Sequence, residues 1–135
     1  GDLARIDEDG YVHFIARKKD IIRRRGENIS GAELDRVLGT HPDLAEAASI
    51  AVPAELGDDE ILMVLVPKEG RKPDCEQILI WCRDHLAPIK VPRFLVIADE
   101  LPHTPSHRVA KHVLKQDAAG LRARAFDAEA SRAAA

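Results

Sequence analysis

The sequence predicts an α+β domain, in which a small mixed sheet is flanked by helices and preceded by a β-hairpin. Segments with strand character alternate with helical patterns along the chain. Residues 61–66 form a continuous apolar run, which is typical of a central strand covered on both faces. With 135 residues, 45% of them hydrophobic and 32% charged, the chain has the size and composition of one globular domain.

The predicted β-hairpin opens the chain. Short apolar segments at residues 3–7 and 11–15 flank an acidic turn that ends in Gly10. Positively charged residues occupy positions 17–19, directly before a predicted strand at residues 20–22. Positive charge concentrated between two strands suits the binding of an anion.

A glycine loop and a helix follow this basic segment. Gly26 can adopt backbone conformations that a side chain would exclude. Ser30 and Glu33 have the spacing of a capping box, which predicts that a helix begins at Ser30. The segment from Gly39 to Pro42 ends this helix. Its predicted buried stripe consists of Leu34, Val37 and Leu38.

The middle of the chain supplies two strands that we expect to pair in one sheet. The first covers residues 44–52 and is broken by Pro53. A turn at residues 57–59 leads into the second strand, the apolar run at residues 61–66.

A second helix and a last strand complete the predicted core. Asp74 is the expected N-cap of this helix, and Pro88 ends it. A strand at residues 94–98, a loop at 99–107 and a short helix follow. The second helix presents five residues on one face: Cys75, Ile78, Leu79, Cys82 and Leu86.

Neither the cysteines nor the histidines predict a metal or redox site. Cys75 and Cys82 would lie about 10 Å apart along a helix, which exceeds the reach of a disulfide. No Cys-x-x-Cys pair accompanies them. His103 and His107 have helical spacing, but Pro105 between them opposes a helix. We therefore expect no metal bound by protein side chains.

Charge and hydropathy narrow the class of protein. The net charge of −3 argues against a nucleic-acid binder that relies on general electrostatics. The chain has no long apolar run, so no membrane span is predicted. The first residues lack the apolar core of a signal peptide, and a cytoplasmic location is the resulting expectation.

Residues 16–30 resemble a run found in the adenylate-forming enzymes, which include the AMP-forming acyl-CoA synthetases. In that family the run reads Gly-Arg-x-(Lys/Asp)-Asp-x-Ile, followed by Gly-Glu-Asn-Ile, and Ala16 departs from its first glycine. Further matches at residues 41–42, 52–53, 86–93 and 100–102 extend the resemblance over nearly the whole span from Asp2 to Lys115.

The resemblance implies a domain organisation. In this family the run links a large amino-terminal domain to a small carboxy-terminal lid that rotates between two half-reactions. Residues 1–115 would be the lid, and the residue that matches its hinge is Lys19. Residues 116–135 are rich in alanine and arginine, and we expect either a frayed helix or a disordered tail there.

The resemblance also implies ligand-binding residues. Asp2 matches an aspartate that binds the ribose hydroxyls of ATP, and its alternative role is that of a solvated residue. Arg17 matches an arginine that contacts ATP, with an ion pair to Asp20 as the alternative. The loop of Gly26, Glu27 and Asn28 would line the tunnel for the pantetheine arm of coenzyme A. Arg23 to Arg25 either face the phosphates of coenzyme A or form a solvated strand edge.

The segment from Leu101 to Lys111 resembles the closing motif of the family, in which a Gly-Lys pair brings a catalytic lysine to the carboxylate and α-phosphate. Here the pair reads His107-Arg108. Three readings follow: Arg108 supplies the cation, Lys111 reaches in instead, or adenylation is impaired.

The function implied is that of the mobile carboxy-terminal domain of an AMP-forming acyl-CoA ligase. Its substrates would be a carboxylic acid, ATP with Mg²⁺, and coenzyme A, and its partner the missing amino-terminal domain. The isolated domain would have little activity. The alternatives are an adenylation domain that loads a carrier protein and a non-catalytic binding or regulatory module with the same fold.

Overall fold

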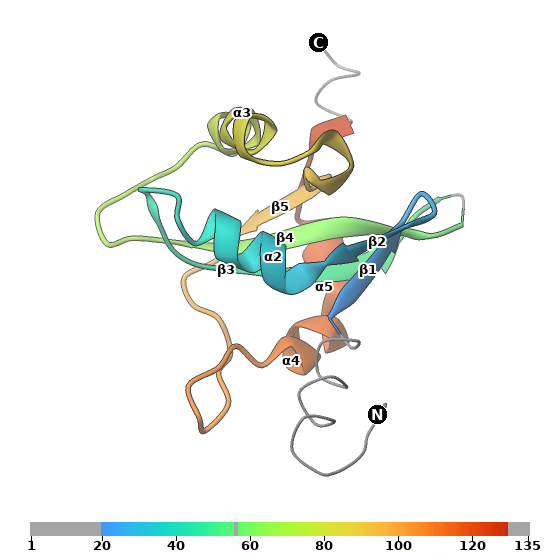
Figure 1. Ribbon diagram of the computed structural model, residues 1–135. Coiled ribbons are helices and arrows are strands. Elements are labelled where there is room, and N and C mark those ends of the chain that lie inside the picture. The colour runs from blue at the N-terminus through green and yellow to red at the C-terminus, as the bar shows by residue number, and fades with distance from the viewer. Residues whose placement is uncertain (1–19, 56, 130–135) are drawn as a thin grey trace, which may run out of the picture.

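The computed structural model describes residues 20–55 and 57–129 of the chain, which form one mixed sheet, one separate hairpin and helices around them (Figure 1). The hairpin pairs β1 (Ile21–Arg24) with β2 (Glu27–Ser30). The sheet has four strands in the order β3 (Leu44–Pro53), β4 (Asp59–Pro67), β5 (Phe94–Ile97) and β6 (Phe126–Asp127). The helical elements are α2 (Gly31–Leu38), α3 (Cys75–His85), the 3-10 turn η1 (Pro88–Lys90), α4 (Lys111–Gln116) and α5 (Ala118–Ala123).

Strand directions confirm the predicted fold class. β4 runs antiparallel to β3 and parallel to β5, and β5 runs antiparallel to β6, so the sheet is mixed. In Figure 1, α3 lies above the sheet, whereas α4 and α5 lie below it. The protein is therefore a mixed α+β domain with helices on both faces of a small sheet.

β4 is the central strand that its apolar run predicted. Every residue from Glu60 to Val66 is buried. Successive side chains point to opposite faces, and the two faces of the sheet belong to two separate apolar clusters. Ile61, Met63 and Leu65 pack with α2, α3 and the hairpin. Leu62, Val64 and Val66 pack with β5, α4 and α5.

The first helix begins where the capping box predicted. The Ser30 hydroxyl accepts a hydrogen bond from the Glu33 amide at 3.1 Å, and the helix then runs to Leu38. Leu34 and Leu38 are fully buried. This local sequence signal therefore sets the start of α2, and its buried leucines hold the helix against the core.

The second helix buries its cysteine face, and both cysteines are free thiols. Ile78, Leu79 and Cys82 are buried, and burial raises the pKa of the Cys82 thiol to about 12. Trp81 is half-buried and stacks on His85, with 3.9 Å between the ring centroids. Cys82 is therefore a core residue, as its position on the helix predicted.

The chain beyond residue 115 differs from the expected frayed or disordered tail. It forms α5 and β6, Leu121 is buried, and Leu95 and Phe94 pair with Phe126 and Asp127. A few apolar side chains among many alanines are enough to cover one edge of the sheet. The folded domain thus extends at least to residue 129. The hairpin predicted for residues 3–15 lies outside the described residues.

Within the described residues, no helix is long and apolar enough to cross a membrane. The same residues include no group of three or more His, Cys, Asp or Glu side chains that could hold a metal ion.

Candidate functional site

Three of the predicted site residues lie outside the described residues. They are Asp2, Arg17 and the hinge residue Lys19, and their roles stay predictions. Asp20, directly after Lys19, is the first described residue.

The turn between β1 and β2 is a two-residue connection made by Arg25 and Gly26. Both have positive φ, +52° and +82° respectively, as the hairpin turns that match strand twist require. The Gly26 amide donates a hydrogen bond to Asp58 Oδ2 at 2.7 Å. The turn that the glycine predicted is therefore held in place by the loop before β4.

Beyond this turn, β2 exposes the other two residues predicted to bind coenzyme A. Glu27 and Asn28 are both exposed, and they lie in a strand rather than in a loop. Arg23 donates a hydrogen bond to Asn28 Oδ1 across the hairpin at 3.1 Å. Ile29 is buried beside Ile22 beneath them. The hairpin thus presents a polar, solvent-facing edge on an apolar base.

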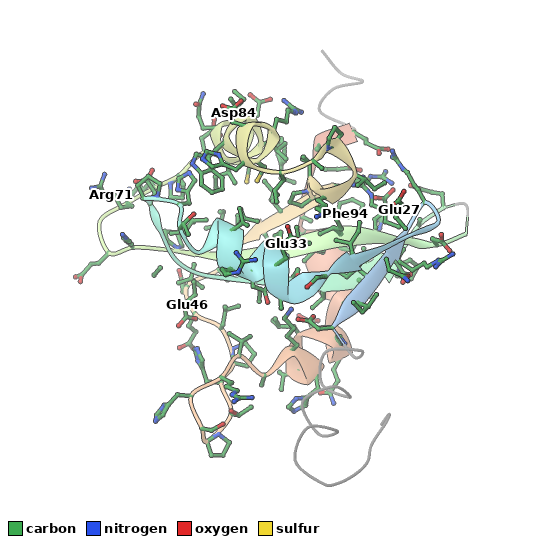
Figure 2. The ribbon with its side chains drawn as sticks, in the orientation of Figure 1. Glu27, Glu33, Glu46, Arg71, Asp84 and Phe94 are labelled. Atoms are coloured by element: carbon green, nitrogen blue, oxygen red, sulfur yellow. The ribbon has the colours of Figure 1, made fainter. Side chains whose placement is uncertain are left out.

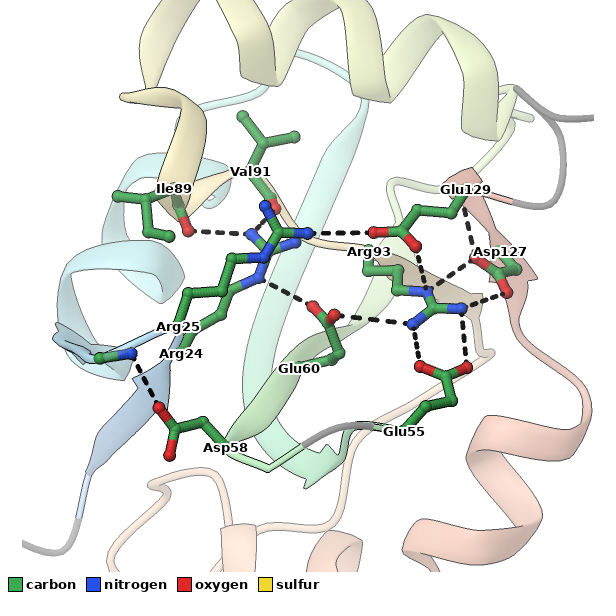
Figure 3. A network of polar contacts seen from close by, with 11 residues as sticks. Arg24, Arg25, Glu55, Asp58, Glu60, Ile89, Val91, Arg93, Asp127 and Glu129 are labelled. Atoms are coloured by element: carbon green, nitrogen blue, oxygen red, sulfur yellow. Dashed lines mark hydrogen bonds and ion pairs between the residues drawn. The ribbon is translucent and has the colours of Figure 1, made fainter.

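Arg24 differs from its two arginine neighbours because it is buried. Its guanidinium donates to Glu60 Oε1 at 2.8 Å and to the carbonyls of Ile89 and Val91, both at 2.9 Å (Figure 3). Arg24 therefore joins the hairpin to the central strand and to the turn after α3. The idea that it faces the phosphates of coenzyme A is wrong.

Arg93 forms the second half of this network, on the other side of Glu60 (Figure 3). It donates two hydrogen bonds to Glu55, at 2.8 and 3.1 Å, and two to Asp127, at 3.1 and 3.3 Å. Its guanidinium also lies 3.6 Å from Glu60. These contacts connect β4 and β6 to the residue that directly precedes β5. The hydrogen bonds that Arg93 donates to Glu55 and Asp127 raise the pKa of Arg93.

This network predicts a pH dependence of stability. The hydrogen bonds that Arg93 donates lower the pKa of Glu55 from 4.5 to about 2. A carboxyl group with a lowered pKa stabilises the folded state above its unfolded pKa, and that contribution is lost as the pH falls toward the folded pKa. Denaturant titrations should show wild type more stable than Glu55→Gln at pH 7, with the difference vanishing between about pH 4.5 and 2. A difference that does not vary with pH would contradict this assignment.

Arg108 lies in a loop that is closed by its own backbone. The Ala110 amide donates to the Pro102 carbonyl at 2.8 Å, and the Thr104 amide donates to the Arg108 carbonyl at 2.7 Å. Leu101 and Ala110 are buried at its base, whereas Arg108 is exposed. Among the described residues no acidic side chain pairs with the Arg108 guanidinium. The loop therefore presents a cation that is free to meet an anionic ligand.

His107, which replaces the glycine of the family motif, has a φ of +68°. This left-handed conformation costs a residue with a side chain about 1–2 kcal/mol, and glycine adopts it freely. We expect His107→Gly to raise the free energy of unfolding by up to about 1 kcal/mol, since glycine gives back part of the gain as chain entropy. Urea denaturation measures the change, and a clear loss of stability would show that the His107 side chain makes a compensating contact.

Lys111, the other predicted catalytic cation, is engaged in ion pairs. Its Nζ lies 2.8 Å from Asp20 Oδ1 and 2.7 Å from Asp35 Oδ2. It also donates to the Ser49 hydroxyl at 3.3 Å. Of the two candidate cations, Arg108 is thus available to a ligand and Lys111 is neutralised.

The two predicted ligand-binding regions lie far apart on the domain. The turn between β1 and β2 projects on the right of Figure 1, and the loop of Arg108 hangs at the lower left. Glu46 lies beside this loop in Figure 2, and its Oε2 is 3.1 Å from His103 Nε2. An ion pair therefore also joins the loop to β3 when His103 is protonated.

Comparisons with known proteins agree with this fold and these motifs. The family model described as AMP-binding enzyme C-terminal domain matches residues 33–108, which is more than half of the chain. The chain belongs to this family. The match includes α2 from Glu33 onward, the whole of β3, β4 and β5, and the loop up to Arg108.

Curated relatives of this AMP-binding C-terminal domain carry the names of CoA ligases. Over 116 residues the chain is 40% identical to oxalate-CoA ligase of Arabidopsis thaliana, and these residues are 86% of the chain and 23% of that protein. It is also 39% identical over 116 residues to 3-methylmercaptopropionyl-CoA ligase of Ruegeria pomeroyi, again 86% of the chain and 22% of the relative. The chain thus spans less than a quarter of the length of these relatives.

Solved structures match the same domain. ATP-bound MatB of Rhodopseudomonas palustris superposes with a TM-score of 0.69 and 28% sequence identity, over 73% of this chain and 20% of that one. The o-succinylbenzoate CoA synthetase of Bacillus subtilis, solved in complex with its acyl-adenylate intermediate, gives a TM-score of 0.68 and 28% identity, with the same coverage.

Proposed function

We propose that this domain is the mobile carboxy-terminal lid of an AMP-forming acid-CoA ligase, and that Arg108 supplies its adenylation cation. This proposal rests on the exposed Arg108 guanidinium, which pairs with no acidic side chain of the described residues. Arg108 occupies the position of the lysine in the family motif, in a loop that backbone hydrogen bonds close. The names of the relatives support the reaction class.

The first half-reaction joins a carboxylate to ATP. A carboxylate oxygen attacks the α-phosphorus, the bond to the β-phosphate oxygen breaks, and acyl-AMP and pyrophosphate form. Negative charge gathers on the oxygens that surround the α-phosphorus in the transition state. A positioned guanidinium stabilises that charge and can donate to carboxylate and phosphate oxygens at once. Mg²⁺ would accompany the ATP phosphates.

The second half-reaction transfers the acyl group to a thiol. The thiol of coenzyme A loses its proton to water, its sulfur attacks the acyl carbonyl, AMP leaves with the electron pair of the acyl-oxygen bond, and acyl-CoA forms. Arg108 must then withdraw so that the thiol can approach. A rotation near Lys19 would replace the Arg108 loop with the hairpin edge of Gly26, Glu27 and Asn28. Because the hairpin turn and the loop lie on different sides of the domain, one rotation can exchange them.

There are two alternatives, another subgroup of the same enzymes and a module of a different class. An adenylation domain that loads a carrier protein would share the first half-reaction and differ only in the acceptor. A non-catalytic module with the same fold is suggested by the change from Gly-Lys to His107-Arg108. The cytoplasmic location expected from the sequence stays a prediction.

The experiment uses the full-length protein that contains this domain, with a panel of carboxylic acids. We expect acid-dependent exchange of labelled pyrophosphate into ATP, followed by release of AMP and a thioester when coenzyme A is added. Thioester formed only on a carrier protein would support the first alternative. No exchange with any acid, from a protein that still binds ATP, would support the second.

A further inference from the structure

Lys111 sits in a charged cluster beside β3, the edge strand of the sheet, and three separate elements contribute to it. Asp20 comes from the start of the hairpin, Asp35 from α2 and Ser49 from β3, and each has a polar atom within 3.3 Å of the Lys111 ammonium. Two carboxylates face one cation, and the Lys111 side chain is only 17% exposed. The Asp35 carboxylate is anchored further by the Ser49 amide, which donates to it at 2.7 Å.

Gly31, at the start of α2, lies directly against this cluster. A Cβ atom added at Gly31 would approach Asp20 Oδ1 and the Ser49 hydroxyl too closely, so a side chain here would displace one or both of them. The Gly31 amide also donates to the Asp20 carbonyl at 2.8 Å. The position of Asp20 is therefore fixed by its backbone and by its side chain.

The place of Lys111 in the chain gives this cluster a consequence for the Arg108 loop. Lys111 directly follows Ala110, whose amide closes the loop onto Pro102. Its partner Asp20 directly follows the predicted hinge residue Lys19. One ion pair, 91 residues apart in sequence, thus ties the base of the Arg108 loop to the point where the domain would pivot.

We propose that Lys111 is a positioning residue. Its ion pair with Asp20 makes the Arg108 loop move as one body with β1, the strand that follows the predicted hinge residue. This inference rests on the proposed function. A rotation of the domain at the hinge brings Arg108 to a defined position only if the Arg108 loop is rigid relative to the rest of the domain. In this proposal Lys111 itself does not touch substrate. If it left the cluster, the two partly buried carboxylates of Asp20 and Asp35 would have no cation beside them. Burial already disfavours the charged form of Asp35 and raises its pKa.

The test measures both half-reactions separately in the full-length enzyme. Lys111→Met should lower acyl-adenylate formation about 10²-fold, which is the typical cost of a misplaced catalytic group. Thioester formation from supplied acyl-adenylate, which does not use Arg108, should keep its wild-type rate. If the rates of both half-reactions fell equally, Lys111 would only stabilise the fold in general, and the proposal would be wrong. Lys90→Met is the matched control, since it breaks another partly exposed ion pair, with Glu33, away from the loop.

A second variant separates positioning from direct catalysis. Asp20→Asn releases Lys111 from one partner. It should lower adenylation as Lys111→Met does, and the double variant should be no worse than Lys111→Met alone, because Lys111→Met already removes the ion pair with Asp20. If Asp20→Asn leaves adenylation unchanged or raises it, Lys111 acts on the substrate and the proposal is wrong. Lys111→Arg keeps the charge and should restore most of the lost rate.

Hydrogen exchange supplies a readout that does not depend on activity. In the full-length Lys111→Met protein, the amides of Thr104, His107 and Ala110 should exchange faster than in wild type, while those of β4 stay protected. Unchanged exchange in the loop would overturn the proposal even if adenylation fell. If the wild-type enzyme activates no acid, the proposed function fails, and the exchange data alone decide whether Lys111 holds the loop.

Discussion

Replacing Arg108 with alanine in the full-length protein should lower acyl-adenylate formation by about 10²–10³-fold, the usual cost of one lost transition-state donor. The exposed guanidinium has no described acidic partner, so its removal leaves the folded domain unchanged. Formation of the thioester from a supplied acyl-adenylate should continue, because that step needs the cation withdrawn. Rapid-quench measurement of the two half-reactions provides both rates.

Two controls sharpen this prediction. Arg108→Lys keeps a cation of similar reach and should retain much of the adenylation rate, as the family motif carries lysine there. Arg124→Ala removes another exposed arginine, on a different segment, and should change neither half-reaction. If Arg108→Ala slowed both half-reactions equally, the assignment of Arg108 to adenylation would be wrong.

Arg24→Met should produce the largest loss of stability. Arg24 and Glu60 are only 6% and 7% exposed, and breaking such a buried ion pair typically costs about 3–5 kcal/mol. The substitution would also leave the carbonyls of Ile89 and Val91 without their donor. Urea denaturation should show a lower midpoint, which measures this loss.

The adjacent residue on the same strand is the matched control. Arg23 is 55% exposed and its nearest carboxylate oxygen, on Asp58, is 3.9 Å away. Exposed pairs of this kind contribute at most about 1 kcal/mol, so Arg23→Met should change the midpoint little. Similar losses for the two variants would contradict the view that the buried Arg24, and not the exposed Arg23, joins the hairpin to the central strand.

Local signals predicted the elements whose residues interact with near neighbours. The capping box at Ser30 needs only Glu33, three residues away, and α2 begins there. The apolar run at residues 61–66 requires burial on both faces whatever the partners are, and β4 occupies the centre of the sheet. Such features follow from short stretches of sequence.

The polar network follows from contacts between distant segments, which a linear reading does not bring together. Arg24 and Glu60 are 36 residues apart, and Arg93 and Asp127 are 34 apart. One signal was present, however. Strand residues two apart share a face, so Arg24 had to lie on the same side as buried Ile22. Reading residues 23–25 as three equivalent arginines overlooked this alternation.

The roles of the two candidate cations illustrate the same limit. The motif spacing placed both Arg108 and Lys111 near the active site, and sequence alone left their roles open. The fold gives the two cations different surroundings, because it brings Asp20 and Asp35 from remote positions onto Lys111 and leaves Arg108 exposed. Nothing near Lys111 in the sequence indicates those partners.

The most direct test of the account is a crystal structure of the full-length enzyme with an unreactive analogue of the acyl-adenylate. We predict that the Arg108 guanidinium lies about 3 Å from an oxygen of the α-phosphate group, the distance of a charge-assisted hydrogen bond. Lys111 should remain bound to Asp20 and Asp35. A structure in which Lys111 contacts the phosphate, and Arg108 points into solvent, would contradict the account.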